Sequence, residues 1–370
     1  PETMVFVPEE PLARGTRYVA RLDSGARAAT GAMSLQDAQV WRFTTVNEPG
    51  VVSTSPEDRA RDVDPGGSLN ITFAGPMERQ GFLDHLTISP GVTNVYTYWT
   101  EYDTSVQVAF EQEPATTYNV RLDEDTPDKY GAPLGQATGI RYTTGDLEPF
   151  ASLQTVGRLG TYGTYTETVI YAAHRNVSLL EASLSRLRPA TFLRLNRDWE
   201  AWERYEPADS ALIRAWSQRV TGPPNEVRLA RLELLDGDGD ALLPGLYYVR
   251  LDAPEVEKTP EYQPSRYMFV KSRLNLALKQ ARGEALVWTT DLVTGQPVEG
   301  LPITLQSTAQ VSSGTTDQDG LFAARDLRVN DLWQPFMALS GEPGDEDFGI
   351  AYNGWDQGIN PWNYEIESEF

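Results

Sequence analysis

The stretch that decides the fold covers residues 283–322 and reads G-E-A-L-V-W-T-T-D-L-V-T-G-Q-P-V-E-G-L-P-I-T-L-Q-S-T-A-Q-V-S-S-G-T-T-D-Q-D-G-L-F. An apolar strand at residues 286–288 is followed by a polar turn at 291–297 and by a returning strand at 303–305, whose side chains alternate between two faces. A second turn at 317–320 leads into the apolar pair L-F. Strands that recur at this spacing predict a small antiparallel β-sandwich.

The polar residues that recur in this stretch are turn formers. Aspartate and asparagine side chains bond their own backbone, and glycine supplies the positive φ that tight turns require. These positions are therefore explained by chain reversal, and the stretch predicts a scaffold without catalytic side chains.

Composition limits the classes of protein that this chain represents. Its 370 residues, 40% of them apolar, are enough for roughly two to four domains with substantial cores. The formal net charge is -22, and the arginines are scattered among acidic residues without forming a basic patch. Such a surface repels phosphate backbones and anionic lipids, so we expect neither nucleic acid nor a membrane as a partner. We expect a monomer.

Cysteine is absent from the sequence. This excludes disulfides, thiolate nucleophiles and cysteine-ligated zinc within these residues. No apolar run approaches the roughly 18 residues of a spanning helix, and no signal-peptide pattern opens the chain. Because the sequence begins with Pro1 and Glu2, we expect a piece of a longer protein whose signal or lipid anchor lies upstream.

An internal repeat is the second strong signal. T-R-Y-V-A-R-L-D at residues 16–23 matches T-T-Y-N-V-R-L-D at 116–123, and R-F-T-T at 42–45 matches R-Y-T-T at 141–144. The offset of about 100 residues is the size of one β-sandwich domain. The second copy is complete, whereas residues 1–46 hold only the closing strands of the first. Three states are open for this half: disordered, paired with a neighbouring chain, or folded as a small independent sheet.

The complete copy carries a further pattern between its first and last strands. L-N-I-T-F at residues 69–73 alternates, Pro76 and Met77 break the strand, and T-I-S-P follows at 87–90. Residues 1–146 thereby resemble the bacterial Ig-like domains of S-layer and other surface proteins, in which Phe-x-x-Pro-Met precedes such a segment. The resemblance implies β-sandwich modules that act as spacers.

Beyond G-D-L-E-P at residues 145–149 the pattern changes, and residues 209–220 predict a helix inserted among strands. Asp209 or Ser210 would cap it, and G-P-P at 222–224 would end it. Its apolar positions recur at helical spacing and would share one face. These positions are Leu212, Ile213, Trp216 and Val220.

Residues 147–370 resemble the amino-terminal macroglobulin domains of the bacterial alpha-2-macroglobulin family. The resemblance rests on the order of these segments: Y-A-A-H-R-N-V-S (171–178), A-L-I-R-A-W-S (211–217), L-P-G-L-Y (243–247), A-L-V-W-T-T-D-L (285–292), T-G-Q-P-V (294–298), T-T-D-Q-D-G (315–320) and W-D-Q-G-I-N-P-W (355–362). It implies a protease trap in which a bait segment is cleaved and the molecule rearranges. Many members also carry a Cys-x-x-Gln thioester, which this cysteine-free sequence cannot contain. No functional residue of the family is therefore carried over.

The candidate metal ligands are Asp236, Asp238 and Asp240, whose alternate spacing opens calcium loops. An EF-hand would need glycine at the sixth position and glutamate at the twelfth, where this chain has Ala241 and Tyr247. A polar hairpin turn is the competing interpretation. The acidic run at residues 342–347 is interpreted as a solvated loop.

Other chemistry has less support. His85 and His174 fall in different predicted domains, and no G-x-S-x-G elbow is present. Trp199 and Trp202 are expected to cover a core, with sugar binding as the alternative. Paired carboxylates of a glycosidase stay open, because sequence does not give their separation. We expect no catalytic residue, no cofactor and no enzyme activity.

The predicted architecture is an all-β tandem of Ig-like and macroglobulin β-sandwiches with one short inserted helix. Its parts are a partial Ig-like domain at 1–46, an Ig-like domain at 47–146, a macroglobulin-like domain at 147–272 with the helix near 209–220, and another at 273–370. The expected function is the non-catalytic amino-terminal part of a bacterial protease inhibitor, periplasmic or at the cell surface, that meets proteases only through the full-length protein. The alternative is a cell-surface adhesion or ligand-binding array.

Overall fold

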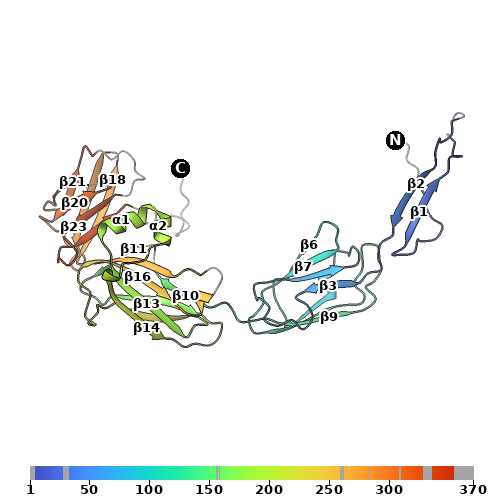
Figure 1. Ribbon diagram of the computed structural model, residues 1–370, viewed down its shortest axis with the longest axis horizontal. Helices are drawn as coiled ribbons and strands as arrows, with labels where there is room; N and C mark the ends of the chain where they lie inside the picture. Colours follow the sequence, from blue (N-terminus) through green and yellow to red (C-terminus); the bar gives the residue numbers. More distant parts are fainter. Residues whose placement is uncertain are drawn as a thin grey trace. The chain divides into compact units, whose positions relative to one another are not determined.

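The computed structural model describes residues 5–27, 33–155, 157, 159–258, 262–281, 283–307, 310–327 and 336–353. The chain divides into two compact units, Pro1–Leu147 and Glu148–Phe370 (Figure 1). Within the described residues, strands dominate and helices are short, so the predicted all-β class is confirmed. Among these residues, no helix is long and apolar enough to cross a membrane.

The first unit contains a sandwich of a four-stranded and a three-stranded antiparallel sheet. The four-stranded sheet has the order β3 (Val51–Ser55), β4 (Leu69–Phe73), β7 (Ser105–Ala109) and β6 (Tyr96–Trp99). The three-stranded sheet has the order β5 (Leu86–Ser89), β8 (Thr117–Leu122) and β9 (Thr138–Thr143), and the 3-10 turn η1 (Phe82–His85) precedes β5. We call this the Ig-like sandwich.

Its core follows from the alternation seen in the sequence. Leu69 and Ile71 of one sheet face Val120 and Tyr142 of the other, and all four are almost fully buried. Alternate positions along a strand point to opposite faces, so the apolar positions that alternate along β4, β8 and β9 enter the core.

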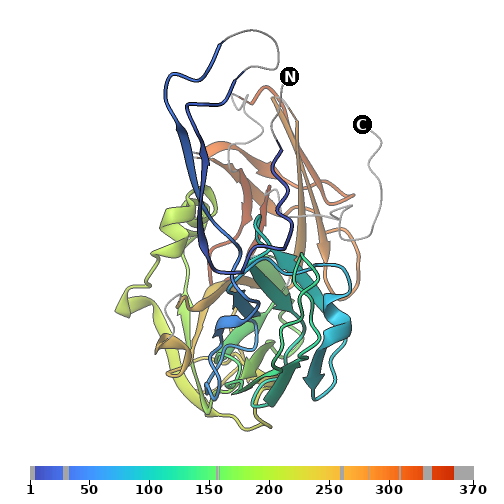
Figure 2. The ribbon, with the colours of Figure 1, turned by 90° about the vertical axis from the view of Figure 1, so that its right-hand side faces the viewer.

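Residues ahead of this sandwich form a two-stranded antiparallel ribbon of β1 (Arg17–Leu22) and β2 (Gln39–Thr44), visible side by side in Figures 1 and 2. The ribbon repeats the β8–β9 pair in register. Tyr18 lies opposite Phe43 just as Tyr118 lies opposite Tyr142, with ring centroids 5.9 Å and 5.8 Å apart. Of the three states open for residues 1–46, the described residues show the small sheet.

The repeat extends to individual hydrogen bonds at the base of each pair. Thr16 N donates to Thr45 Oγ1 at 2.9 Å, and Thr116 N donates to Thr144 Oγ1 at 2.9 Å. The Tyr18 hydroxyl likewise accepts from a backbone N–H at 2.9 Å, as the Tyr118 hydroxyl does at 2.8 Å. The ribbon is thus the closing half of an Ig-like sandwich in its hydrogen bonding.

Burial separates the two copies. Trp41 and Phe43 of the ribbon are 50% and 44% exposed, whereas their counterparts Ile140 and Tyr142 are 4% and 1% exposed. An ion pair of 2.6 Å between Arg14 Nη1 and Asp128 Oδ2 links the ribbon's base to the Ig-like sandwich. Backbone hydrogen bonds and the stacked Tyr18–Phe43 pair therefore hold the ribbon's strands together, while its apolar face stays largely uncovered among the described residues.

The second unit begins with a sandwich that we call the first macroglobulin-like sandwich. Its three-stranded sheet has the order β10 (Phe150–Gln154), β12 (Val169–Arg175) and β15 (Arg228–Glu233). Its five-stranded sheet has the order β11 (Leu159–Gly163), β17 (Ser265–Ser272), β16 (Gly245–Asp252), β13 (Leu179–Arg186) and β14 (Leu212–Arg219). Strand β11 runs parallel to β17, and the other pairs are antiparallel.

The predicted helix at residues 209–220 is wrong. Only the 3-10 turn η2 (Asp209–Ala211) precedes a strand, β14, which pairs with β13. The register shifts so that Leu184 faces Arg214 and Ser185 faces Leu212, which leaves Ile213 as an extra residue. A β-bulge of this kind breaks the period of two. The apolar residues of this strand are therefore spaced as they would be on one face of a helix.

The helices lie earlier, at α1 (Pro189–Arg197) and α2 (Trp199–Glu203). Their signals were present in the sequence. Pro189 occupies the start of α1, where its missing N–H costs nothing, and Asp198 caps α2 by accepting from Ala201 N at 3.1 Å. The 3-10 turn η3 (Val256–Lys258) lies between β16 and β17.

The second macroglobulin-like sandwich contains residues 283–307 and 310–322. One sheet has the order β18 (Leu274–Ala281), β19 (Glu284–Asp291) and β22 (Leu321–Ala324). The other has the order β21 (Gln310–Thr315), β20 (Pro302–Gln306), β23 (Met337–Ser340) and β24 (Gly349–Tyr352). The predicted strands and turns are confirmed, since Asp317 Oδ1 accepts from Asp319 N and Leu321 N at 3.0 and 2.9 Å.

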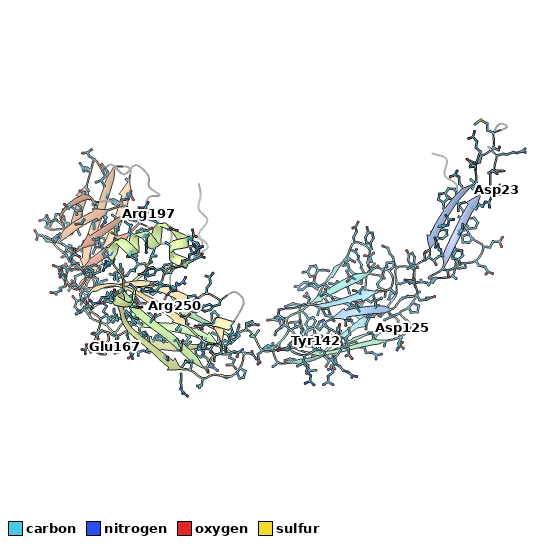
Figure 3. All side chains as sticks on the ribbon, viewed as in Figure 1. Asp23, Asp125, Tyr142, Glu167, Arg197 and Arg250 are labelled. Atoms are coloured by element: carbon cyan, nitrogen blue, oxygen red, sulfur yellow. The ribbon has the colours of Figure 1, made fainter. Side chains whose placement is uncertain are left out.

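The two copies of the closing strand pair offer a matched test of what burial contributes. We expect Tyr142→Ala, in the core position labelled in Figure 3, to lower the free energy of unfolding by about 3–5 kcal/mol. Phe43→Ala at the equivalent ribbon position should cost less than about 1 kcal/mol, because Phe43 is already half exposed. Urea unfolding of the three proteins measures both values, and equal losses would contradict the uncovered face.

Candidate functional site: the joint of the second unit

The two macroglobulin-like sandwiches are joined without a linker. Strand β17 ends at Ser272 and β18 begins at Leu274, so Arg273 alone separates them. The Ser272 hydroxyl donates to Phe348 O at 2.6 Å and accepts from Leu274 N at 2.8 Å. We call the residues that connect the two sandwiches the joint.

Arg273 provides the electrostatic part of the joint. Its guanidinium pairs with Asp347, and Nη1 lies 3.5 Å from Asp291 Oδ2. Asp347 ends the acidic run between β23 and β24, and Gly344 of the same run donates its N–H to Pro244 O at 2.8 Å. The acidic run is mostly exposed, as expected for a solvated loop, but it also holds the two sandwiches together.

Lys271, two residues before Arg273, is a buried charged group of the first sandwich. Its side chain is 1% exposed, and Nζ donates to Thr166 O at 2.7 Å and to Thr168 Oγ1 at 2.8 Å. Both acceptors are uncharged, and burial lowers the pKa of Lys271 below that of an ordinary lysine.

Helices α1 and α2 supply the apolar part of the joint (Figure 1). They pack on β16 and β17 and, at the same time, on strands of the second sandwich, which makes one shared core. The first sandwich contributes Leu246, Tyr248, Met268 and Val270, the helices contribute Phe192, Leu193, Leu195 and Trp202, and the second sandwich contributes Met337, Phe348 and Ile350. Strand β16 is therefore buried on both faces, which explains its continuous apolar sequence.

Aromatic contacts fix the helices on both sides of the shared core. The Phe192 and Tyr352 rings meet edge to face with centroids 5.6 Å apart, and the Tyr352 hydroxyl donates to Asn196 O at 3.4 Å. On the other side, Tyr205 meets Tyr248 edge to face at 5.1 Å. Such pairs add to the burial of apolar area.

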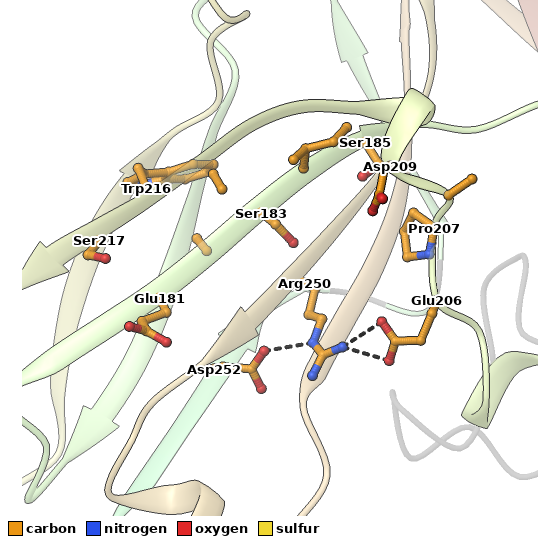
Figure 4. Close-up of a pocket in the computed structure, with 14 residues that line it drawn as sticks. Glu181, Ser183, Ser185, Glu206, Pro207, Asp209, Trp216, Ser217, Arg250 and Asp252 are labelled. Carbon is orange, nitrogen blue, oxygen red and sulfur yellow. Dashed lines mark hydrogen bonds and ion pairs between the residues drawn. The ribbon is translucent and has the colours of Figure 1, made fainter.

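A pocket of about 490 Å³ with both polar and apolar lining opens on the outer face of β13, β14 and β16, beneath the segment that leads from α2 to β14 (Figure 4). Arg250 crosses it. Its Nη1 contacts the Glu206 carboxylate at 2.6 and 2.7 Å, and its Nε contacts Asp252 Oδ2 at 2.6 Å. Burial opposes the charge on Arg250, but hydrogen bonds to Tyr262 and Asp252 and the nearby Glu206 outweigh it, so the pKa of Arg250 is raised.

The pocket resembles a structural ion-pair network more than a reactive site. Glu206 and Asp252 are both held by Arg250, and histidine is absent from the lining. A general acid or base needs a carboxyl or imidazole that is available to a substrate. The hydroxyls of Ser183, Ser185 and Ser217 and the carboxylates of Glu181 and Asp209 also line the pocket.

The candidate metal ligands form a hairpin turn between β15 and β16. Asp236 Oδ1 accepts from Asp238 N at 3.0 Å and from Asp240 N at 2.8 Å, so this carboxylate caps the turn. Among the described residues, no three carboxylate or imidazole groups gather closely enough to hold a metal ion.

The remaining candidates lie apart. His85 belongs to the first unit and His174 to the second, where burial lowers the pKa of His174. Trp202 enters the shared core, while Trp199 is 59% exposed.

Sequence reasoning missed the joint, although a lysine within the apolar run Y-M-F-V-K-S at 267–272 was a usable signal.

The family model described as bacterial Ig-like domain matches residues 46–144. Two crystal structures of Salmonella alpha-2-macroglobulin, one reacted with methylamine and one of the mutant Y1175G, share 16% identity and cover 80% and 82% of this chain with TM-scores of 0.60 and 0.61. The chain shares its fold with the matched part of these structures. The chain spans 18% of the length of both structures.

An Escherichia coli alpha-2-macroglobulin structure spanning domains MG0-NIE-MG1 also shares 16% identity, with 84% of this chain and 96% of that chain covered at a TM-score of 0.45. No curated protein sequence matches the chain. The resemblance drawn from the sequence is therefore confirmed for the fold, both for the Ig-like sandwich and for the alpha-2-macroglobulin architecture. The segment at 355–362 lies outside the described residues.

Phe192 tests whether the two macroglobulin-like sandwiches share one core. Phe192→Ala should cost about 3–5 kcal/mol, because the ring is fully buried between them. Hydrogen exchange should then accelerate in β16 and in β24 together. Trp199→Ala, on the same helical insertion but exposed, is the control. Unchanged protection of β24 in Phe192→Ala would show that the sandwiches are independent.

Lys271 predicts a pH dependence of stability. Because its pKa in the folded chain is below the ordinary 10.5, the unfolded chain binds more protons between the two values, and stability rises with pH there. Lys271→Met should remove this rise, whereas Lys279→Met at an exposed position should keep it. Urea unfolding from neutral pH toward 10.5 measures the slopes, and an unchanged slope in Lys271→Met would refute the assignment.

Proposed function

We propose that this chain is the non-catalytic amino-terminal part of a bacterial protease-trapping macroglobulin and acts as its spacer and brace. The observation that carries the proposal is the joint: two β-sandwiches fused without a linker over one shared core. The alpha-2-macroglobulin fold supports the choice of protein class.

The mechanism of this part is mechanical. A sandwich keeps its shape because its sheets interlock at close-packed density, and a shared core removes the freedom that a flexible linker would give. Arg273 adds ion pairs with Asp347 and Asp291 that separate only at a desolvation cost. The pair of sandwiches therefore transmits displacement as one body when a partner domain moves.

No covalent step is assigned to these residues. The sequence has no cysteine for a thioester, and the carboxylates beside Arg250 are engaged in ion pairs. We infer that proteases are met only by the full-length protein. A periplasmic or cell-surface position in a bacterium fits the bacterial origin of the matched structures, and a monomer fits the charge of -22.

A protease-protection assay tests the function. The full-length protein mixed with a protease should abolish digestion of a large protein substrate while leaving cleavage of a small peptide, because a trap excludes by size. The chain of residues 1–370 alone should inhibit neither reaction. Continued digestion of the large substrate by the mixture with full-length protein would rule out the trap and leave the adhesion array as the better assignment.

A further inference from the structure

The outward residues of strands β3, β4, β7 and β6 carry no charged side chain, and Arg79 meets the end of this face, where its Nη2 donates to Thr100 O at 3.1 Å. Alternate residues point outward, while Leu69, Ile71, Val106 and Val108 between them point into the core. We call the outward set the neutral face; its members are Ser53, Ser55, Asn70, Thr72, Tyr96, Tyr98, Thr100, Ser105, Gln107 and Ala109.

Strand register arranges the neutral face in rows. Ser55 lies opposite Asn70, Asn70 opposite Gln107, and Gln107 opposite Tyr98, so hydroxyl, amide and phenol groups cross the sheet in one line. Adjacent strands are about 4.8 Å apart, which makes the row a continuous polar track. Gln107 presents amide donors and a carbonyl acceptor on it, and Asn70 presents a carbonyl acceptor beside an amide whose Nδ2 also donates to Ser68 O at 3.5 Å.

Two tyrosines border this track. Tyr96 and Tyr98 stand two residues apart on the edge strand β6 and are 58% and 61% exposed. Exposed aromatic rings pair an apolar face with a polar hydroxyl, the combination that binds ligands with both apolar and hydroxylated surfaces. Gln107 is exposed as well, and its side chain makes no hydrogen bond among the described residues.

The absence of charge distinguishes the neutral face from its surroundings. The chain carries a net charge of -22, and the outward face of the opposite sheet bears Arg121 and Arg141. A charged ligand would be recognised through opposite charges, and none stand on the neutral face. Its chemistry instead matches a ligand with many hydroxyl or amide groups and apolar ring faces.

We propose that the neutral face binds a neutral glycan chain of β-linked hexopyranoses. Sugar rings stack on Tyr96 and Tyr98, and their hydroxyl or N-acetyl groups bond Asn70 and Gln107. A protein partner fits less well, because protein hot spots fill desolvated pockets and this face is a flat strand surface with hydroxyl and amide groups around its tyrosines. The site is independent of the protease-trap function.

Calorimetric titration of residues 1–370 with hexamers of β-1,4-linked N-acetylglucosamine and of β-1,4-linked glucose tests the proposal. At least one hexamer should bind, and Tyr98→Ala should weaken the affinity about tenfold through loss of ring stacking. Tyr171→Ala is the matched control, since Tyr171 is 48% exposed on an outward strand face but lies opposite Arg231. It should bind as the unaltered chain does.

Three results overturn the proposal. The first is that neither hexamer binds. The second is that Tyr98→Ala binds the hexamer as tightly as the unaltered chain does. The third is that the affinity for the hexamer falls steeply with added salt, as it does for charge-driven recognition. The proposal is also overturned if a protein partner binds this face while neither hexamer does. Because Tyr98 is exposed, thermal unfolding of Tyr98→Ala should match that of the unaltered chain, which separates lost binding from lost folding.

Discussion

The burial of strands β16 and β17 on both faces is the constraint on which the second unit depends. One face belongs to the core of the first macroglobulin-like sandwich, and the other is covered by α1 and α2. A sheet face that apolar residues line must be removed from water, and the helices do this only because Met337 and Ile350 of the next sandwich close the same core. The joint between the sandwiches is thus a consequence of burial.

The first unit shows the same physics in its incomplete form. The ribbon and the β8–β9 pair have the same register and the same hydrogen bonds, yet Phe43 is exposed where Tyr142 is buried. Hydrogen bonding between neighbouring strands is local and survives without a second sheet. Burial needs a partner sheet, and it is burial that supplies most of the stability of a sandwich.

Charge acts at particular places in this acidic chain. Arg273 and Arg250 each gather carboxylates where β-sandwich surfaces meet a loop, whereas Lys271 is buried beside uncharged acceptors. In contrast, the strand residues of the neutral face of the Ig-like sandwich carry no charge. These features fit the scaffold role proposed above, in which polar groups hold elements in place, and the neutral face fits the proposed glycan binding.

The sequence by itself determined the strands and turns, because alternation, glycine and self-bonding aspartates such as Asp317 act within a few residues. It also determined the repeat and the class of fold. Only the tertiary structure decided that residues 212–219 form a strand, since a bulge against β13 imitates helical spacing. It also decided that α1 and α2 pack against both sandwiches in one core and that Lys271 is buried. Burial depends on which surfaces meet, and contacts between distant segments leave no local pattern in the sequence.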